Sequence, residues 1–126
     1  MTLINGVTLT NFVVSPDGSM ISINVIDDHS QPGSLVLPSA SLRSLIMSMP
    51  EMMQQALRRQ YHDPSLRLVY PLGTWHLETS AEPGKLILTL STSDGFAVSF
   101  AVTANDLRQF ANTAKRARHV RGTHSN

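Results

Sequence analysis

Three short groups of polar residues have side chains that could carry acid–base or metal chemistry. Asp27, Asp28 and His29 bring two carboxylates beside an imidazole, a combination able to bind a hard cation or to share a proton. Adjacent loop positions point in different directions, however, and the chain contains no H-x-x-x-H pattern that would complete a site. We therefore interpret this group as a solvated turn.

The other two groups surround histidines. His62 follows a long helical pattern, where the helix dipole favours a protonated imidazole without any catalytic role. His76 and Glu78 are two residues apart, so they share one face of a strand and could form a proton-transfer pair, with Trp75 on the opposite face as a core residue. A structural role is the preferred interpretation, and an enzyme or ligand carrier with a site near His76 and Glu78 is kept as an alternative.

No linear motif for catalysis or cofactor binding stands out in the chain. It has no G-x-S-x-G, S-x-x-K, P-loop or G-x-G-x-x-G pattern. It also has no cysteine, which excludes disulfides, thiolate metal sites and cysteine nucleophiles. We predict no catalytic residue, no cofactor and no metal, and expect a binding protein rather than an enzyme.

Four methionines crowd around Pro50 in a long helical pattern, namely Met47, Met49, Met52 and Met53. Met49 and Met53 fall on the apolar side of that pattern, and Met47 and Met52 lie toward its edges. Methionine is flexible and polarizable, which suits adaptable surfaces that accept a partner helix or a second subunit. Ordinary core filling is one interpretation, and a protein interface formed by these four residues is the other.

Positive charge gathers at the C-terminal end, although the formal net charge is only +1. The basic cluster consists of Lys115, Arg116, Arg118 and Arg121, with Arg108 earlier on the same helix. Such a cluster can neutralise phosphates, although cations are also stabilised at a helix C-terminus by its dipole. Most aromatic residues are interpreted as buried, which argues against base stacking. A nucleic-acid-binding or transcription-associated module is therefore the alternative function, and an acidic protein a possible partner.

Hydrophobic periodicity outlines the first half of the chain. Alternation predicts strands over residues 7–14, 20–26 and 34–37, with a turn at Ser15-Pro16-Asp17-Gly18. A helical pattern opens at Pro38-Ser39 and meets Pro50. Because proline removes an interior amide donor, and because Ser48 and Glu51 fit a second capping box, we expect two short helices or one sharply kinked helix.

The second half has the clearest pattern. Strands are predicted over residues 66–70, 73–79, 86–91 and 96–102, and the turn before the last is Ser93-Asp94-Gly95. Thr103 stands where an N-cap belongs, with Asp106 three residues on, so a helix should follow. Residues 122–126 are polar and are expected to be disordered.

The hydrophobic pattern recurs after about 65 residues, so that Ile21, Ile23 and Val25 fall on Leu86, Leu88 and Leu90. We predict the α+β class, with two tandem β-meander-plus-helix units (βββα-βββα, possibly four strands each). The halves, 1–60 and 66–121, would pack as one pseudo-twofold domain of residues 1–121 with antiparallel sheet. Two unrelated halves of similar make-up are the alternative.

This element order resembles that of the purine-rich-element-binding (PUR) repeat, in which two such units intertwine and bind single-stranded nucleic acid. The resemblance covers most of the chain and concerns the order of elements. No PUR sequence motif corresponds to residues of this chain, so no binding residue is carried over.

These observations favour a small non-enzymatic cytoplasmic protein that binds itself or another protein. No apolar run approaches the roughly 20 residues of a spanning helix, and the N-terminus lacks a basic region followed by an apolar core, so no membrane association is expected. Exposed strand edges are commonly covered by dimerisation. A homodimer is therefore the expected assembly.

Overall fold

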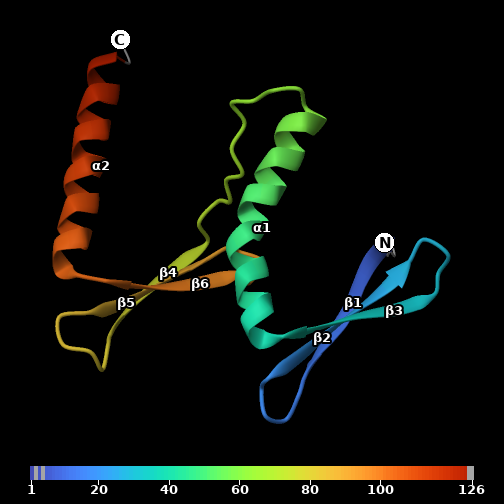
Figure 1. Cartoon of the computed structure of the whole chain (residues 1–126). Coiled ribbons are helices and arrows are strands. Elements are labelled where there is room, and N and C mark those ends of the chain that lie inside the picture. The colour runs from blue at the N-terminus through green and yellow to red at the C-terminus, as the bar shows by residue number, and fades with distance from the viewer. Residues whose placement is uncertain (2, 4, 125–126) are drawn as a thin grey trace. The chain divides into compact units, whose positions relative to one another are not determined.

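The computed structural model describes the backbone of residues 1, 3 and 5–124, and within that range every side chain except those of residues 7 and 119–124. The chain divides into two units, Met1–Leu68 and Val69–Asn126. Each contains a three-stranded antiparallel sheet followed by a helix (Figure 1). The α+β class and the βββα-βββα order are therefore confirmed, while the single pseudo-twofold domain stays a prediction.

The first sheet has the strand order β1-β2-β3. Its strands are β1 (Gly6–Val14), β2 (Met20–Asp27) and β3 (Pro32–Pro38), each within two residues of its predicted bounds. Runs of apolar and β-branched residues at every second position favour this extended backbone. The meander predicted for the first half is confirmed.

The turn between β1 and β2 is closed by its own side chains. The Gly18 amide donates to the Ser15 carbonyl at 2.9 Å, and Gly18 has a φ of 74°, which glycine adopts without strain. The Asp17 Oδ1 atom accepts hydrogen bonds from the Ser15 hydroxyl at 2.7 Å and from the Ser19 amide at 3.0 Å. The predicted turn is therefore confirmed, and it is stabilised by local polar contacts.

A single helix, α1 (Ser39–Gln60), follows the first sheet and includes Pro50. Of the two predicted alternatives, two short helices are wrong, as is the second capping box, whereas a kink at Pro50 stays a prediction. The Ser48 hydroxyl donates backwards to the Ser44 carbonyl at 3.0 Å, a bond typical of serine inside a helix, and does not cap a new helix with Glu51. The helix therefore continues through the proline.

The second sheet has the order β4-β5-β6. Its strands are β4 (Thr74–Thr79), β5 (Leu86–Ser91) and β6 (Ala97–Val102), and the helix that follows is α2 (Ala104–His124). Residues 125 and 126 of the predicted disordered tail lie outside the described residues, whereas α2 extends to His124. Each sheet thus has three strands, and the possible fourth strand is not formed in the described part.

The strand predicted over residues 66–70 is wrong, because this segment is bonded to α1 by side chains. The Arg58 Nε–H donates to the Leu66 carbonyl at 2.8 Å, and the Leu68 amide donates to Gln54 Oε1 at 3.3 Å. The Leu66 carbonyl and the Leu68 amide therefore find partners without a neighbouring strand.

Helix α2 begins with the predicted capping box. The Asp106 amide donates to Thr103 Oγ1 at 3.1 Å, and the Thr103 amide donates to Asp106 Oδ2 at 2.9 Å. This second bond is the main cause that lowers the pKa of the Asp106 carboxyl below its usual value. Two backbone donors at the helix start are thereby satisfied.

The ladders of the two sheets share one register. The central row of apolar partners is Phe12, Ile23 and Leu35 in the first sheet and Leu77, Leu88 and Phe100 in the second. Each residue of the second row follows its counterpart in the first by about 65 residues, which is the spacing at which the sequence pattern recurs. The repeated pattern thus corresponds to repeated strand pairing, and a common origin of the halves stays a prediction.

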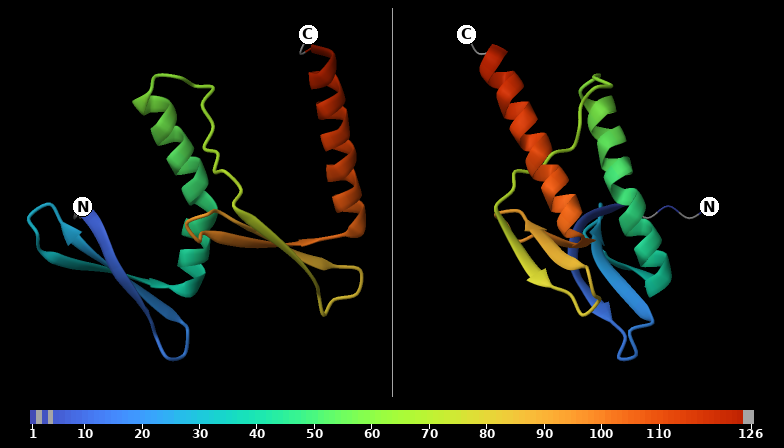
Figure 2. Two further views of the ribbon diagram at one scale, coloured as in Figure 1. Left: turned by 180° about the vertical axis from the view of Figure 1, so that it is seen from behind. Right: turned by 90° about the vertical axis from the view of Figure 1, so that its left-hand side faces the viewer.

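Each helix leaves the end of the preceding strand and extends beyond its sheet, as Figures 1 and 2 show. Helix α1 contacts β2 and β3, whereas α2 has no contact of that extent with its own strands in the described part. Val102, with 7% of its surface exposed, is the only buried hydrophobic side chain among those described. Neither unit therefore closes a core of its own.

Candidate interaction surface

One face of the first sheet is mainly apolar, with Asp27 at the end of β2 as its charged member. Strand pairing aligns on it Leu9, Phe12, Val14, Ile21, Ile23, Val25, Leu35 and Leu37. Side chains alternate between the two faces of a strand, so the alternation read from the sequence produces this surface directly. In a folded protein such a face is normally covered.

The opposite face of the same sheet is mixed, with a bonded polar cluster beside the exposed apolar side chains of Val13, Met20 and Val36. The Asn24 Nδ2 group donates to Asn11 Oδ1 at 2.7 Å, and the Ser34 and Ser22 hydroxyls donate to Asn24 Oδ1 at 2.6 and 3.2 Å. Its hydrogen-bonding groups are thus partly satisfied by each other, and water can reach the rest.

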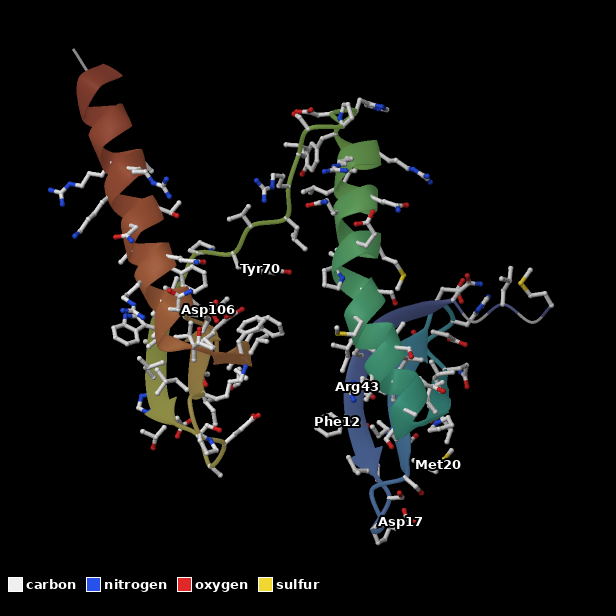
Figure 3. The ribbon with its side chains drawn as sticks, turned by 60° about the vertical axis from the view of Figure 1, so that its left-hand side comes forward. Phe12, Asp17, Met20, Arg43, Tyr70 and Asp106 are labelled. Atoms are coloured by element: carbon white, nitrogen blue, oxygen red, sulfur yellow. The ribbon has the colours of Figure 1, made fainter. Side chains whose placement is uncertain are left out.

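An open apolar hollow of about 750 Å³ lies over the apolar face. Its lining is Leu9, Thr10, Asn11, Phe12, Val14, Ile21, Ile23 and Leu42, without a charged residue. Leu42 comes from the start of α1, so helix and sheet meet at this hollow. Phe12 is 71% exposed, and Figure 3 shows its ring projecting from β1.

Helix α1 carries an apolar stripe that continues from Leu42. Its members are Leu42, Leu45, Ile46, Met49 and Met53, at the spacing of one helical face. None of the 22 residues of α1 is buried. The stripe and the hollow together are called the unit 1 apolar surface below.

The methionines named from the sequence are all exposed, but they do not share one direction. Met49 and Met53 are on the stripe, Met52 is at its edge, and Met47, five residues after Leu42, lies about 140° away around the helix. Met47 is also the most exposed of the four, at 78%. The predicted interface residues therefore divide into a pair on the stripe, one residue at its edge and Met47 well away from it, so the expectation that Met47 lies toward the edge is wrong.

The second sheet has an apolar face of the same plan. It presents Trp75, Leu77, Leu88, Leu90, Val98 and Phe100, and a hollow of about 310 Å³ lies between part of this face and residues 70–72. Beside that hollow, the rings of Tyr70 and Phe96 have centroids 6.2 Å apart. Both sheets thus offer uncovered apolar surface.

The interpretation of the aromatic residues as mostly buried is wrong. The exposed aromatic side chains are Phe12, Tyr61, Tyr70, Trp75, Phe96, Phe100 and Phe110. Trp75, expected in a core, is 65% exposed. Alternation placed Trp75 on the apolar face correctly, and only its burial differs.

His76 and Glu78 lie on the polar face of β4, as the alternation predicts. The row that contains His76 continues through Thr89 to Ser99, whose hydroxyl is 2.7 Å from that of Thr89. Neither His76 nor Glu78 lines the two hollows described above. Among the hollows lined by described residues, none includes either member of this pair.

Asp27, Asp28 and His29 have possible ligand atoms that all lie within 4.8 Å of one another. The bonds they make are those of a turn. Asp27 Oδ1 accepts from the amides of His29 and Gln31 at 2.9 and 2.8 Å, and His29 Nδ1 lies 3.0 Å from an Asp28 oxygen. The structure thus gives these carboxylates local partners, in keeping with a solvated turn.

The segment after α1 is also a bonded turn. His62 has a φ of 54°, and Asp63 Oδ1 accepts from the Ser65 amide at 2.9 Å and from its hydroxyl at 2.6 Å. The Ser65 hydroxyl is the main cause that lowers the pKa of the Asp63 carboxyl. These contacts fix the chain direction after the helix, and they place no catalytic partner beside His62.

The predicted basic cluster lies on α2. Arg108, Lys115, Arg116 and Arg118 are exposed, and the side chain of Arg121 lies outside the described residues. Because a helix turns by about 100° per residue, positions 115, 116 and 118 project in different directions. The described cations therefore do not form one flat basic face.

Sequence reasoning missed the part that Phe12 and Leu42 have in an exposed surface. Their periodicity is also that of core positions, and the hollow that they share appears only when the strand and the helix are placed together. No residue pattern separates a core position from an interface position, because both are apolar.

None of the helices described is both long and apolar enough to cross a bilayer. A scan of protein-family models, a search of curated proteins and a search of solved structures each give no match to this chain. The likeness to the PUR repeat is accordingly one of element order alone.

Proposed function

We propose that this chain is a small non-enzymatic cytoplasmic protein that works by binding protein, and that its first partner is a second copy of itself. One observation carries the proposal. Helix α1 has an amphipathic sequence of 22 residues, and none of them is buried.

An amphipathic helix in a folded protein owes most of its stability to packing of its apolar face. Covering one Leu, Ile or Met side chain contributes about 1.5–3 kcal/mol relative to leaving it exposed. The stripe from Leu42 to Met53 offers several such side chains. A protein partner that covers them supplies stabilisation that the isolated chain lacks.

The methionines suit this role because their side chains adjust to the shape of a partner. Met49 and Met53 lie on the stripe and are about half exposed. A surface that contains both aliphatic and methionine side chains favours protein association over binding of a small polar ligand.

The test is the mass of the chain in solution, measured by sedimentation and light scattering from low to high micromolar concentration. We expect a dimer that M49E/M53E weakens by tenfold or more, because two carboxylates would be placed on the stripe. M47E, on the same helix but about 140° from Leu42, is the matched control and should have a much smaller effect. A monomer throughout this concentration range would contradict the proposed self-association.

A second candidate function is nucleic-acid binding through the basic residues of α2. The exposure of the aromatic side chains favours it, since bases can stack on accessible rings. Titration of labelled single- and double-stranded oligonucleotides at two salt concentrations tests it. Binding should weaken with salt and be reduced in K115A/R116A/R118A, whereas binding that neither change affects would contradict it.

A further inference from the structure

Three peptide bonds of the chain join an asparagine or an aspartate to a glycine, namely Asn5–Gly6, Asp17–Gly18 and Asp94–Gly95. In such a pair the glycine nitrogen can attack the side-chain carbonyl carbon of the residue before it, because glycine has no Cβ to block the approach. The product is a five-membered succinimide ring. Hydrogen bonds that hold the attacking nitrogen or the side chain oppose this reaction.

The first aspartate–glycine pair is held inside its turn. The Gly18 amide donates to the Ser15 carbonyl at 2.9 Å, so the nitrogen that would attack is occupied. The Asp17 carboxylate accepts hydrogen bonds from the Ser15 hydroxyl and the Ser19 amide, and these bonds lower its pKa to about 2. An ionised carboxylate is a poor electrophile. The turn therefore protects this pair at both reacting groups.

The second aspartate–glycine pair is held in the same way. The Gly95 amide donates to the Thr92 carbonyl at 3.2 Å. The Thr92 hydroxyl donates to the Asp94 carboxylate, which is the main cause that lowers the pKa of this carboxyl. Both turns thus engage the nucleophile and keep the carboxyl group ionised.

The pair Asn5–Gly6 lies at the start of β1 and has a different backbone environment. The Asp28 amide donates to the Asn5 carbonyl at 3.0 Å, so Gly6 and Asp27 form the next pair of the ladder, which is the non-hydrogen-bonded kind. In agreement, the Asp27 amide donates away from β1, to the Gln31 carbonyl at 2.9 Å. The Gly6 amide therefore points away from β2, and β1 is an outer strand of its sheet.

The Asn5 side chain is not held either, since it makes no hydrogen bond with a described residue. By contrast, the Asn24 Nδ2 group donates to Asn11 Oδ1 at 2.7 Å across the same sheet. The carbon of a neutral amide is also more electrophilic than that of a carboxylate. The bond from the Asp28 amide restrains this peptide, but bonds at the end of a strand open readily. Both reacting groups are thus accessible to each other at this pair.

We propose that Asn5 is a site of spontaneous deamidation and isomerisation, and that the two turns suppress the corresponding reaction at Asp17 and Asp94. The Gly6 nitrogen loses its proton and forms a bond to Asn5 Cγ. The Cγ–Nδ2 bond breaks, and Nδ2 leaves as ammonia with that proton. Water then adds to either carbonyl carbon of the succinimide and opens the ring, so position 5 becomes aspartate or isoaspartate without any other reactant.

This modification would alter the start of β1. It adds a negative charge close to the Asp27-Asp28 turn, and like charges on paired strands are destabilising. Isoaspartate also adds one carbon to the main chain, which displaces the carbonyl that accepts from the Asp28 amide. Aged chains should therefore carry one more negative charge and lose protection of the Asp28 amide from hydrogen exchange.

The first experiment ages the whole chain at two pH values, 6 and 8, and follows it by ion exchange and peptide mass spectrometry. A more acidic form should accumulate, with both isomers at position 5, about tenfold or more faster at the higher pH because the attacking nitrogen must lose its proton. Accumulation with its change at another position, or at a rate independent of pH, would overturn the proposal.

The variant G6A is the matched control for the attack by the glycine nitrogen. Its Cβ would meet only the Val25 side chain, at 3.7 Å, so the sheet should be kept, while the added carbon hinders the attack. The change at Asn5 should be slower by about tenfold or more. An unchanged rate in G6A would overturn the proposed route through the succinimide.

The same ageing in urea separates the effect of the structure from that of the sequence. The rate at Asn5 in the folded chain should be within about fivefold of the rate in urea. Isoaspartate at positions 17 and 94 should form about twentyfold or more faster in urea than in the folded chain. A greater protection of Asn5 would overturn the accessibility of this pair, and a smaller ratio at the two aspartates would overturn their suppression by the turns.

Discussion

The two helices follow sheets of the same register, yet different interactions hold them. Helix α2 begins with reciprocal bonds between Thr103 and Asp106. Helix α1 begins after Pro38 without a side-chain cap, and it contains Pro50. The start of α2 is therefore secured by neighbours in sequence, while α1 depends more on what its stripe contacts.

This difference shows which kind of interaction stabilises each helix. Local polar bonds form in an isolated unit, because donor and acceptor are only a few residues apart. Apolar faces gain free energy only when another surface excludes water from them. Unit 1 contains the larger of the two hollows described above and the less well-capped helix, so unit 1 should be the more sensitive to association.

The largest change in stability that bears on the contrast between the two helices is expected from replacing the proline of α1. P50A restores an amide donor for the Ile46 carbonyl and relieves the clash of the ring with the preceding turn, so it should raise the free energy of unfolding by up to about 3 kcal/mol. Urea unfolding at fixed protein concentration, with helicity followed by circular dichroism, measures the gain. An unchanged stability would mean that the helix already compensates for its proline.

The next effect concerns a close contact in unit 2. A Cβ added at Gly73 would lie 2.6 Å from the Ser93 amide nitrogen, so G73A must displace backbone. We expect it to lower the free energy of unfolding by about 1–3 kcal/mol, the usual range for overpacking.

The matched control for G73A is G6A in unit 1. A Cβ at Gly6 meets only the Val25 side chain, at 3.7 Å, which is an ordinary van der Waals distance. Urea unfolding of both variants should show a marked loss for G73A and little change for G6A. Equal losses would show that the close approach at Gly73 is relieved at little cost.

A smaller effect separates the starts of the two helices. T103A removes the acceptor for the Asp106 amide and should cost about 1 kcal/mol. P38S would place a capping hydroxyl before α1 and should stabilise it by a similar amount. If thermal unfolding shifts in opposite directions for these variants, the contrast in capping is confirmed, and a loss in P38S would contradict it.

The sequence was most informative where a structure depends on near neighbours. The Ser15–Gly18 turn, the capping box of α2 and the alternation of both sheets follow from residues a few positions apart, and all are formed. The incorrect predictions concern segments where contacts with distant residues outweigh local preferences. Residues 66–70 have strand-like side chains, but Arg58 and Gln54 satisfy their backbone groups instead.

Proline 50 shows a different limit of local reasoning. Its preference against a helix interior is real, but the helical residues on both sides continue the helix through it. The prediction of the site was limited in another way. Alternation places Phe12 and Trp75 each on the apolar face of its own sheet, but it does not show what covers that face. Burial depends on the whole assembly, which a linear pattern does not contain.

The smallest effect expected is a pH dependence confined to the first turn of unit 1. Hydrogen bonds, chiefly from the Ser15 hydroxyl and then from Ser19, lower the pKa of Asp17 from 3.8 to about 2. Because the folded pKa lies below the unfolded one, the stabilisation is fully present above about pH 4 and is lost as the pH falls through about 2.

The variant D17N removes this charge and tests the assignment directly. The difference in free energy of unfolding between the parent chain and D17N should be constant above pH 4 and should shrink toward pH 2. An NMR titration of the Asp17 carboxyl gives its pKa independently. A midpoint near 3.8 would mean that the turn opens in solution, and this would place the first hairpin of unit 1, like α1, among the parts that need association to become ordered.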